Sequence, residues 1–200
     1  MKTFLLSLIL LLTSFSFSQT QQEIEGYFNE VAYGSDAMIG SQTQIITKWE
    51  KNINLFVEGH YTTQDLIEIK NIVSELNTLL SGIKITIIKN KLESNSIVYF
   101  GDFNTFNKRY LSGTAGNINC NGYCGIFGLY GSPIIESVKI FISSNINSID
   151  RKHVVIEEIT QSLGLANDSW RYPDSIFYEG YSTTDRLSKI DKEVIKMLYK

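Results

Sequence analysis

Apolar residues recur three or four positions apart in three stretches of the chain, which is the spacing of one face of an α-helix. The predicted helices cover residues 21–32, 63–82 and 182–199. Thr63 is the expected N-cap of the second helix, because a threonine hydroxyl can accept a hydrogen bond from a free amide of the first turn. A helix that is apolar on one face needs another layer to pack against.

Alternating and β-branched apolar residues predict strands between these helices. The expected strands lie within residues 45–58, 83–88, 96–100, 125–130 and 138–142, and residues 102–116 are expected to form a loop. A further helix is predicted for residues 148–165. This order favours an α+β fold, in which helices cover one twisted sheet. No linker interrupts the pattern, so residues 19–200 are expected to form one domain.

The first 18 residues have the pattern of a secretory signal peptide. Lys2 supplies a positive charge, and residues 4–12 form an apolar run that is shorter than the ~20 residues needed to span a bilayer. Ser16 and Ser18 stand at suitable positions for cleavage before Gln19. We therefore expect a secreted or periplasmic protein with no transmembrane segment after cleavage.

The charge of the chain argues against nucleic acid as a partner. The sequence has 18 basic and 21 acidic residues, and removal of the signal peptide with its Lys2 leaves a net charge of 17 − 21 = −4. No basic cluster is present that could neutralise a phosphate backbone. The 43% of apolar residues and the presence of only two prolines favour a folded domain over a disordered chain.

Cys120 and Cys124 are the only cysteines in the sequence. In an exported protein they are expected to form a small loop disulfide, because thiols are oxidised outside the cytoplasm. A metal pair is disfavoured, since no histidine or cysteine follows at zinc-site spacing. A redox pair is also disfavoured, because such pairs are usually C-x-x-C and this one is C-x-x-x-C.

The predicted helix over residues 148–165 contains the sequence E-E-I-T-Q-S-L-G, followed by L-A-N-D. It is similar to the H-E-x-x-H-x-x-G-x-x-H motif of zinc peptidases. Glu157, Gln161 and Asn167 occupy the three histidine positions. Glu158 is retained at the general-base position, and Gly164 is retained at the turn that ends the helix.

The chain after this motif resembles the metzincin branch of zinc peptidases. Phe177 and Tyr178 lie in a segment similar to the metzincin Met-turn, with Phe177 in place of the methionine, and residues 187–199 look like the closing helix of matrix proteases. A narrower likeness is to a bacterial family of secreted domains of unknown function. That family reads E-E-x-T-Q-x-L-G-L-x-N-D, here ending at Asp168, and continues with D-S-I-F, here residues 174–177.

The resemblance implies a metzincin-like (zincin) single domain and no established activity. Its twisted mixed sheet would be backed by a long helix, the motif helix and the C-terminal helix. Gly164, Asp168, Phe177 and Tyr178 would support the motif in this fold.

The substitutions change what the motif can bind. Glu157 and Gln161 are four residues apart and share a helix face, and Asn167 is expected to return to that face after Gly164. Zinc prefers imidazole ligands, whereas one carboxylate and two amides suit it poorly. We therefore expect no zinc and no other cofactor, with a weakly held, oxygen-ligated cation left open. Glu158 is a catalytic candidate only if the protein is active, because without a metal it lacks an activated water.

Glu157, Gln161 and Asn167 have a second interpretation, as a hydrogen-bonded cluster that locks the helix to the next loop. His153 is one turn earlier on the same stripe, whereas His60 cannot be placed near it. Three functions stay open. The first is a metallopeptidase-like but non-catalytic domain for peptide or protein binding or for scaffolding. The second is a hydrolase that uses Glu158 with an unusual or weakly held metal. The third is a structural envelope protein.

The resemblance to metzincins implies that the last strands before the motif helix form the rim of a cleft, with one candidate edge strand. It consists of Gly125, Ile126, Phe127, Gly128, Leu129 and Tyr130. An edge strand can pair with an extended peptide or protein segment. The favoured alternative is an ordinary edge that the loop containing the two cysteines shields, because sheet edges are commonly protected.

Overall fold

The computed structural model describes residues 19–33, 45–116 and 118–200. The elements in this part of the chain are α1 (Gln21–Ala32), β1 (Ile53–Gly59), α2 (Thr63–Leu79), β2 (Ile85–Ile87), the 3-10 turn η1 (Lys91–Glu93), β3 (Ser96–Gly101), α3 (Phe103–Tyr110), β4 (Gly122–Phe127), β5 (Ser137–Ser143), α4 (Ser148–Gln161) and α5 (Lys189–Leu198). The predicted signal peptide, residues 1–18, lies outside the described residues. None of the helices in the described ranges is long and apolar enough to cross a membrane.

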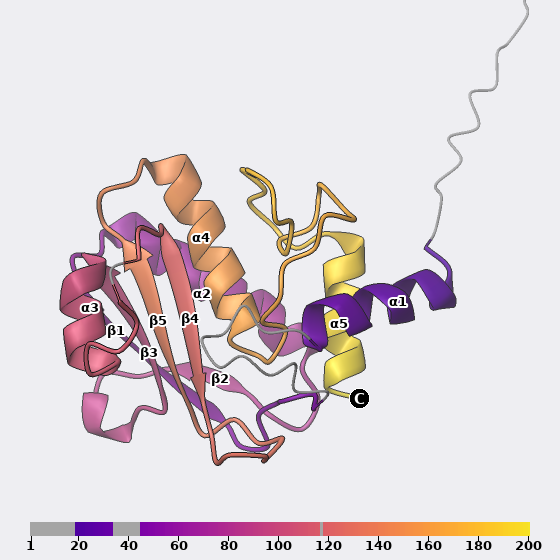
Figure 1. Ribbon diagram of the computed structural model, residues 1–200, viewed down its shortest axis with the longest axis horizontal. Helices are drawn as coiled ribbons and strands as arrows, with labels where there is room; N and C mark the ends of the chain where they lie inside the picture. Colours follow the sequence, from indigo (N-terminus) through magenta and orange to yellow (C-terminus); the bar gives the residue numbers. More distant parts are fainter. Residues whose placement is uncertain (1–18, 34–44, 117) are drawn as a thin grey trace, which may run out of the picture.

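The strands form one mixed sheet in the order β2-β1-β3-β5-β4 (Figure 1). The neighbours from β2 to β5 are parallel, and β4 alone runs antiparallel to its neighbour β5. The crossover from β1 to β2 goes through α2, which is the usual way to connect parallel strands. The predicted α+β architecture with a mixed sheet is confirmed, and β4 lies at one edge.

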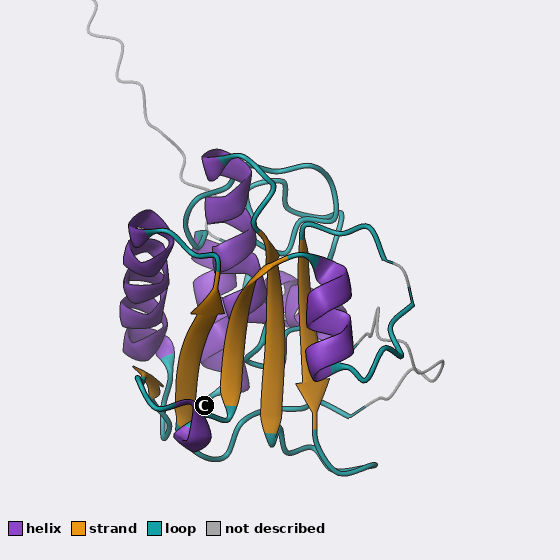
Figure 2. Cartoon of the chain, turned by 90° about the vertical axis from the view of Figure 1, so that its left-hand side faces the viewer, coloured by secondary structure: helices purple, strands orange, loops and turns teal. Residues whose placement is uncertain are grey.

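Two apolar clusters hold the layers together. Val98 and Ile140 face the large cluster on the side of α2, α4 and α5, whereas Tyr99 and Phe141 face a smaller cluster around α3. The alternation follows from the two-residue period of a strand. The sheet is therefore covered on both faces, with α3 alone on its side among the described helices (Figure 2).

The segment predicted to be a loop, residues 102–116, contains helix α3, and that prediction was wrong. The Asp102 carboxylate caps the helix by accepting a hydrogen bond of 2.9 Å from the Thr105 amide. Phe103 and Phe106 are buried against the sheet, and Tyr110 packs beside them. Their spacing of three and four residues is helical, but the helix is too short to give a long periodic signal.

The boundaries of two helices also differ from the prediction at their starts. Thr62, not Thr63, caps α2, because its hydroxyl accepts a hydrogen bond of 3.2 Å from the Asp65 amide while the Asp65 carboxylate accepts one of 2.7 Å from the Thr62 amide. α5 begins at Lys189, well after residue 182, because Ser188 and its downstream aspartate form the same reciprocal box.

A buried aspartate fixes α5 to the rest of the domain. Asp191 is fully buried and accepts hydrogen bonds from the Ser175 hydroxyl at 2.6 Å, the Ile176 amide at 3.1 Å and the Ser188 amide at 2.7 Å. The Ser175 hydroxyl also lies 2.6 Å from the hydroxyl of Tyr27 on α1. This network connects the N-terminal helix, the segment before Phe177 and the last helix.

The predicted edge strand is shifted along the chain. Gly125, Ile126 and Phe127 belong to β4, whereas Gly128, Leu129 and Tyr130 lie outside it. The Leu129 carbonyl accepts a hydrogen bond of 2.9 Å from the Ser132 amide, which forms the turn toward β5. The strand therefore starts at Gly122 and ends three residues earlier than predicted.

Cys120 and Cys124 are free thiols, so the expected disulfide is not observed. The two side chains face opposite sides of the sheet. Cys124 packs against the large cluster beneath α4, and Cys120 packs against the α3 cluster. Cys124 lies within β4, where alternation places it on the α4 side and Tyr123 on the α3 side, whereas Cys120 precedes the strand.

Candidate functional site

Helix α4 is held in place at both ends. The Asn147 side chain caps its start by accepting hydrogen bonds from the first amides. After the end of the helix, the indole of Trp49 donates to the Ser162 carbonyl at 2.8 Å, and the Tyr199 hydroxyl donates to the Leu163 carbonyl at 2.7 Å. α4 ends at Gln161, earlier than the predicted residue 165, because these carbonyls bond to side chains of the surrounding core.

Gly164 is required by the backbone. Its φ angle of +114° lies in the region that favours glycine, and a Cβ atom at this position would collide with the carbonyl of Thr47. The sharp turn after the motif helix therefore depends on this glycine, as the motif predicts.

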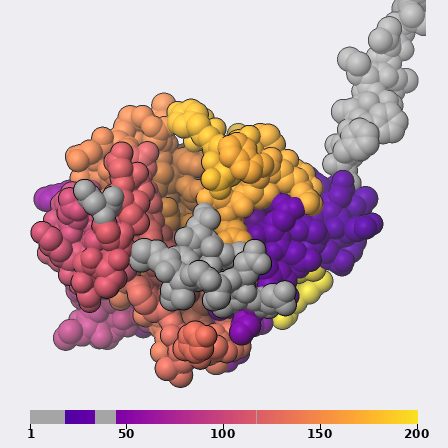
Figure 3. All heavy atoms as spheres, viewed as in Figure 1, coloured from indigo at the N-terminus to yellow at the C-terminus, as the bar shows by residue number. Residues whose placement is uncertain are grey.

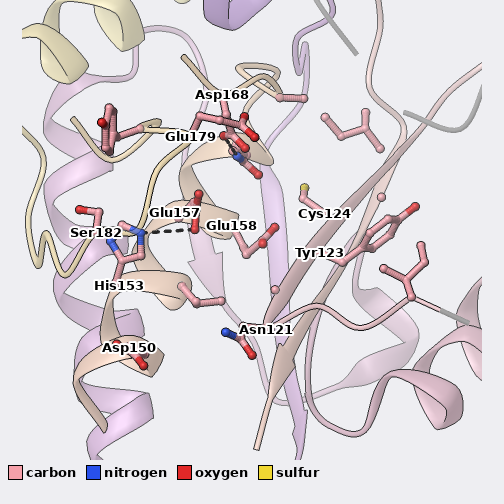
Figure 4. Close-up of a pocket in the computed structure, with 18 of the residues that line it drawn as sticks. Asn121, Tyr123, Cys124, Asp150, His153, Glu157, Glu158, Asp168, Glu179 and Ser182 are labelled. Carbon is pink, nitrogen blue, oxygen red and sulfur yellow. Dashed lines mark hydrogen bonds and ion pairs between the residues drawn. The ribbon is translucent and has the colours of Figure 1, made fainter. Parts of the chain in front are cut away.

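A cleft of about 900 Å³ opens between β4, α4 and the segment that contains residues 178–182. Figure 3 shows the hollow on this face of the molecule. Figure 4 shows side chains from α4 and β4 that point into it. The acidic side chains that line the cleft are Asp150, Glu157, Glu158, Asp168 and Glu179. No lysine or arginine is among the described lining residues, so the cleft is strongly acidic.

Two of the three positions that correspond to the histidines of the zinc-peptidase motif face the cleft and the third does not. Glu157 and Gln161 both line it, whereas the Asn167 amide group donates to the Glu30 carbonyl in α1 at 2.9 Å. Asp168 lies in the cleft instead, where its carboxylate accepts a hydrogen bond of 2.8 Å from the Gln161 side chain. The expectation that Asn167 returns to the motif face was therefore wrong.

The contact with α1 explains this outcome. The backbone amide of Asn167 donates to the Val31 carbonyl at 3.2 Å, so both the side chain and the backbone of this residue are bound to the end of the N-terminal helix. The next residue, Asp168, consequently points the other way. The predicted cluster of Glu157, Gln161 and Asn167 does not form as a unit.

Glu158 is the most buried of the cleft carboxylates. The residue is 6% exposed, and its Oε2 atom is buried without a hydrogen-bond partner. The carboxyl group lies against Gly122 of β4, where a Cβ atom would collide with Glu158 Oε1 and with Val154. Burial raises the pKa of Glu158 well above its usual range, and the charges of Glu157 and Asp168 raise it further.

Glu157 lies beside a histidine. Its Oε2 atom is 3.6 Å from His153 Nε2, and His153 Nδ1 is 2.8 Å from the Thr184 carbonyl. Because a carbonyl only accepts, Nδ1 carries a hydrogen, and this leaves Nε2 as the atom that faces Glu157. Burial, followed by the charges of Asp168 and Glu179, raises the pKa of Glu157 to about 8.

The residues around the cleft do not fit a catalytic zinc ion. Of the three motif positions, one offers a carboxylate with a raised pKa, one offers an amide already bonded to Asp168, and Asn167 faces α1. Within the described ranges, no group of three or more His, Cys, Asp or Glu side chains is arranged to hold a metal ion. Zinc needs about three nitrogen, sulfur or carboxylate ligands from the protein.

The segment after Asp168 packs in the core with Phe177 and lines the cleft with Tyr178. Phe177 is fully buried in the large cluster, and its carbonyl accepts a hydrogen bond of 2.8 Å from the Ser169 amide. Tyr178 lines the cleft and packs edge-on against Trp170 with ring centroids 5.7 Å apart. Phe177, which aligns with the methionine of the Met-turn, therefore packs in the core.

Sequence reasoning missed several residues of the cleft. Gly122, Tyr123, Glu179 and Tyr181 all line it. Glu179 and Tyr181 lie in an irregular segment, and no periodic signal could assign their direction. The glycine at 122 could be placed opposite Glu158 only after the pairing of β4 was known.

The fold and the site together define the class of protein. It is a single α+β domain in which helices cover a mixed sheet, and helix α4 has no histidine at the positions that correspond to the zinc-peptidase motif. More particularly, the chain belongs to the family described as "Protein of unknown function (DUF2927)", which matches residues 21–200. A comparison with curated proteins finds no match.

Two structures of myroilysin are similar to this chain at 16% sequence identity. One has a TM-score of 0.46 and covers 76% of this chain and 95% of the myroilysin chain. The other has a TM-score of 0.48 and covers 86% and 92%.

Proposed function

We propose that the protein is a non-catalytic binding domain that holds an extended segment of a peptide or protein in the acidic cleft. The segment would pair with the outer edge of β4 and extend the sheet by one strand. The observation that carries this proposal is the position of β4. Among the described residues it pairs with β5 only, and its residues 122–127 line the cleft.

The hydrogen bonds of β4 support a free edge. Ser143 of β5 donates to the Asn121 carbonyl at 2.8 Å, which sets the phase of the ladder. Because paired and unpaired residues alternate in an antiparallel strand, Tyr123 and Gly125 bond to β5, and Cys124 and Ile126 direct their backbone groups outward. Such outward groups are the ones that an added strand uses.

The chemistry of the motif helix supports binding without hydrolysis. Glu158, at the general-base position, is buried beside Gly122, and burial keeps it protonated over a wider pH range than an exposed glutamate. A protonated carboxyl cannot take a proton from water. The three motif positions provide no histidine to activate that water.

Hydrogen exchange with a pool of extended hexapeptides tests the edge pairing. The amides of Cys124 and Ile126 are expected to exchange quickly in the free protein and to slow by roughly tenfold or more when peptide is bound. The amides of Tyr123 and Gly125 serve as internal controls, because β5 already protects them. Peptides with N-methyl groups on the face that meets β4 are expected to lose binding.

Two results would overturn the proposal. One is unchanged exchange of Cys124 and Ile126 at peptide concentrations up to the millimolar range. The other is hydrolysis of the same peptides by the purified protein, if the activity disappears in a Glu158→Gln variant.

A further inference from the structure

The cleft contains a buried oxygen atom that lacks a partner. Glu158 Oε2 accepts no hydrogen bond, although the residue is 6% exposed and lines the cleft. Figure 4 shows its carboxyl group pointing from α4 toward β4. Buried polar atoms nearly always have a partner, because an unsatisfied one costs about 1–3 kcal/mol. A ligand that supplies a donor at this point would remove that cost.

The surroundings of Glu158 favour a positively charged donor. The charges of Asp168 and Glu179 raise the pKa of Glu157, and those of Glu157 and Asp168 raise the pKa of Glu158. The described lining contains no lysine or arginine to balance them. A cation in their midst would be attracted by each carboxylate and would favour the ionised form of all of them.

Aromatic side chains complete the lining. Tyr178 and Tyr181 of the segment opposite β4 line the cleft, whereas the ring of Tyr123 packs on the α3 side of the sheet. Tyrosine rings attract cations through their negative faces. A pocket with a carboxylate floor and tyrosine walls suits a long alkyl chain that ends in a positive charge, because the rings contact the alkyl part and the carboxylates contact the charged end.

We propose that the floor of the cleft, formed by Glu157, Glu158 and Asp168, binds the side chain of a lysine or arginine in the peptide that pairs with β4. This inference rests on the proposed function and adds the class of ligand to it. A strand added beside β4 directs alternate side chains to the α4 side of the sheet. One of those side chains would enter the cleft and reach Glu158.

A divalent metal ion fits the same carboxylates less well. Calcium needs about six to eight oxygen ligands, and no trio of potential ligands is in place among the described residues. The Asp168 carboxylate already accepts a hydrogen bond from Gln161, and Glu157 lies beside His153. An ammonium or guanidinium group needs only a few acceptors in one direction, so it can use Glu158 with its neighbours as they stand.

The experiment compares hexapeptides that differ at one central position, which is lysine, arginine, glutamine or norleucine. Fluorescence anisotropy measures their affinity for the mature protein. We expect lysine and arginine to bind at least roughly tenfold more tightly than norleucine and glutamine, which is the range for a hydrogen bond to a charged group. Norleucine is the matched control, because it keeps the alkyl chain of lysine and lacks the charge.

Three variants locate the effect. Glu158→Gln is expected to reduce the preference for lysine over norleucine to about threefold or less. Glu179→Gln, at an exposed position on the rim, is expected to reduce the preference less, and it guards against misfolding of the buried variant. Glu50→Gln removes an exposed charge outside the cleft lining and is expected to change nothing.

The outcomes separate this inference from the proposed function. Equal affinity for the lysine and norleucine peptides would overturn the charge-specific pocket and leave edge pairing intact. A lysine preference that persists in both Glu158→Gln and Glu179→Gln would also overturn it. If no peptide of any composition binds, the proposed function fails and this inference fails with it.

Discussion

The raised pKa of Glu157 makes the stability of the protein depend on pH in an unusual direction. Acidic groups in most proteins have lowered pKa values, so stability is lost toward low pH. Here burial and the neighbouring charges of Asp168 and Glu179 raise the pKa of Glu157 from 4.5 to about 8. The native state therefore keeps its proton where the unfolded state has lost it, and the free energy of unfolding falls as the pH rises between these two values.

The size of the effect follows from the shift. One pKa unit corresponds to about 1.4 kcal/mol, so the full shift amounts to roughly 5 kcal/mol when both states are deprotonated. Only part of this change in the free energy of unfolding is reached at neutral pH, and water that enters the cleft reduces the change further. We expect the free energy of unfolding to decrease by on the order of 2–3 kcal/mol between pH 5 and pH 7.5. Glu158 has a raised pKa as well and adds to the same trend.

Urea unfolding at pH 5 and pH 7.5 measures this dependence. In Glu157→Gln we expect a smaller decrease than in the unmodified protein, together with greater stability at pH 7.5. Glu50→Gln, at an exposed position, is the control and should show the unmodified slope. If the unmodified protein and Glu157→Gln lost stability in parallel, Glu157 would be ionised at neutral pH as an ordinary ion pair with His153, and the reasoning about the cleft would be wrong.

Three further results are expected. Asp191→Ala should lower the free energy of unfolding by roughly 3 kcal/mol in urea titrations, because it leaves buried donors without an acceptor; a loss below about 1 kcal/mol would contradict the role of this network. Gly122→Ala should displace the Glu158 carboxyl group and lower the free energy of unfolding by about 1–3 kcal/mol through overpacking. The lysine hexapeptide should then bind more weakly. Unchanged binding would show that the carboxyl group keeps its position beside the added methyl group. Cys120 and Cys124 should both react with iodoacetamide in denaturant without reductant, as mass spectrometry can show. In the native protein Cys124 should react slowly, because burial raises the pKa of its thiol. If either cysteine reacted in denaturant only after a reductant was added, the two would form a disulfide.

The parts of the fold that local pattern could predict are those with strong periodicity. The helix over residues 63–79 and the strand over residues 96–101 carry long or uniform apolar patterns, and both were expected close to their observed positions. Helix α3 was missed because it is short, and the spacing of Phe103 and Phe106 is too brief a signal. Its stability comes from packing on the sheet, which a local pattern does not reveal.

The relative placement of two candidate side chains could be predicted because a helix fixes their geometry. Glu157 and Gln161 share one face of α4 because four residues make about one turn. The prediction for the third position, Asn167, was wrong because α1 sets the direction of this side chain. The hydrogen bond from Asn167 to the Glu30 carbonyl joins residues more than a hundred positions apart in the chain. The contact between Glu158 and Gly122 likewise depends on how β4 is placed beside α4, and nothing in either segment alone indicates it.

The direction of Asn167 also limits how a metal centre could be designed into this fold. Histidine placed at residues 157, 161 and 167 would direct the third imidazole toward the N-terminal helix and remove the hydrogen bond that anchors Asn167 there. A designer would place the third histidine at the position of Asp168, which already contacts Gln161. A metal-dependent centre in this fold would therefore require a ligand set whose third member stands one residue later than in the zinc-peptidase motif.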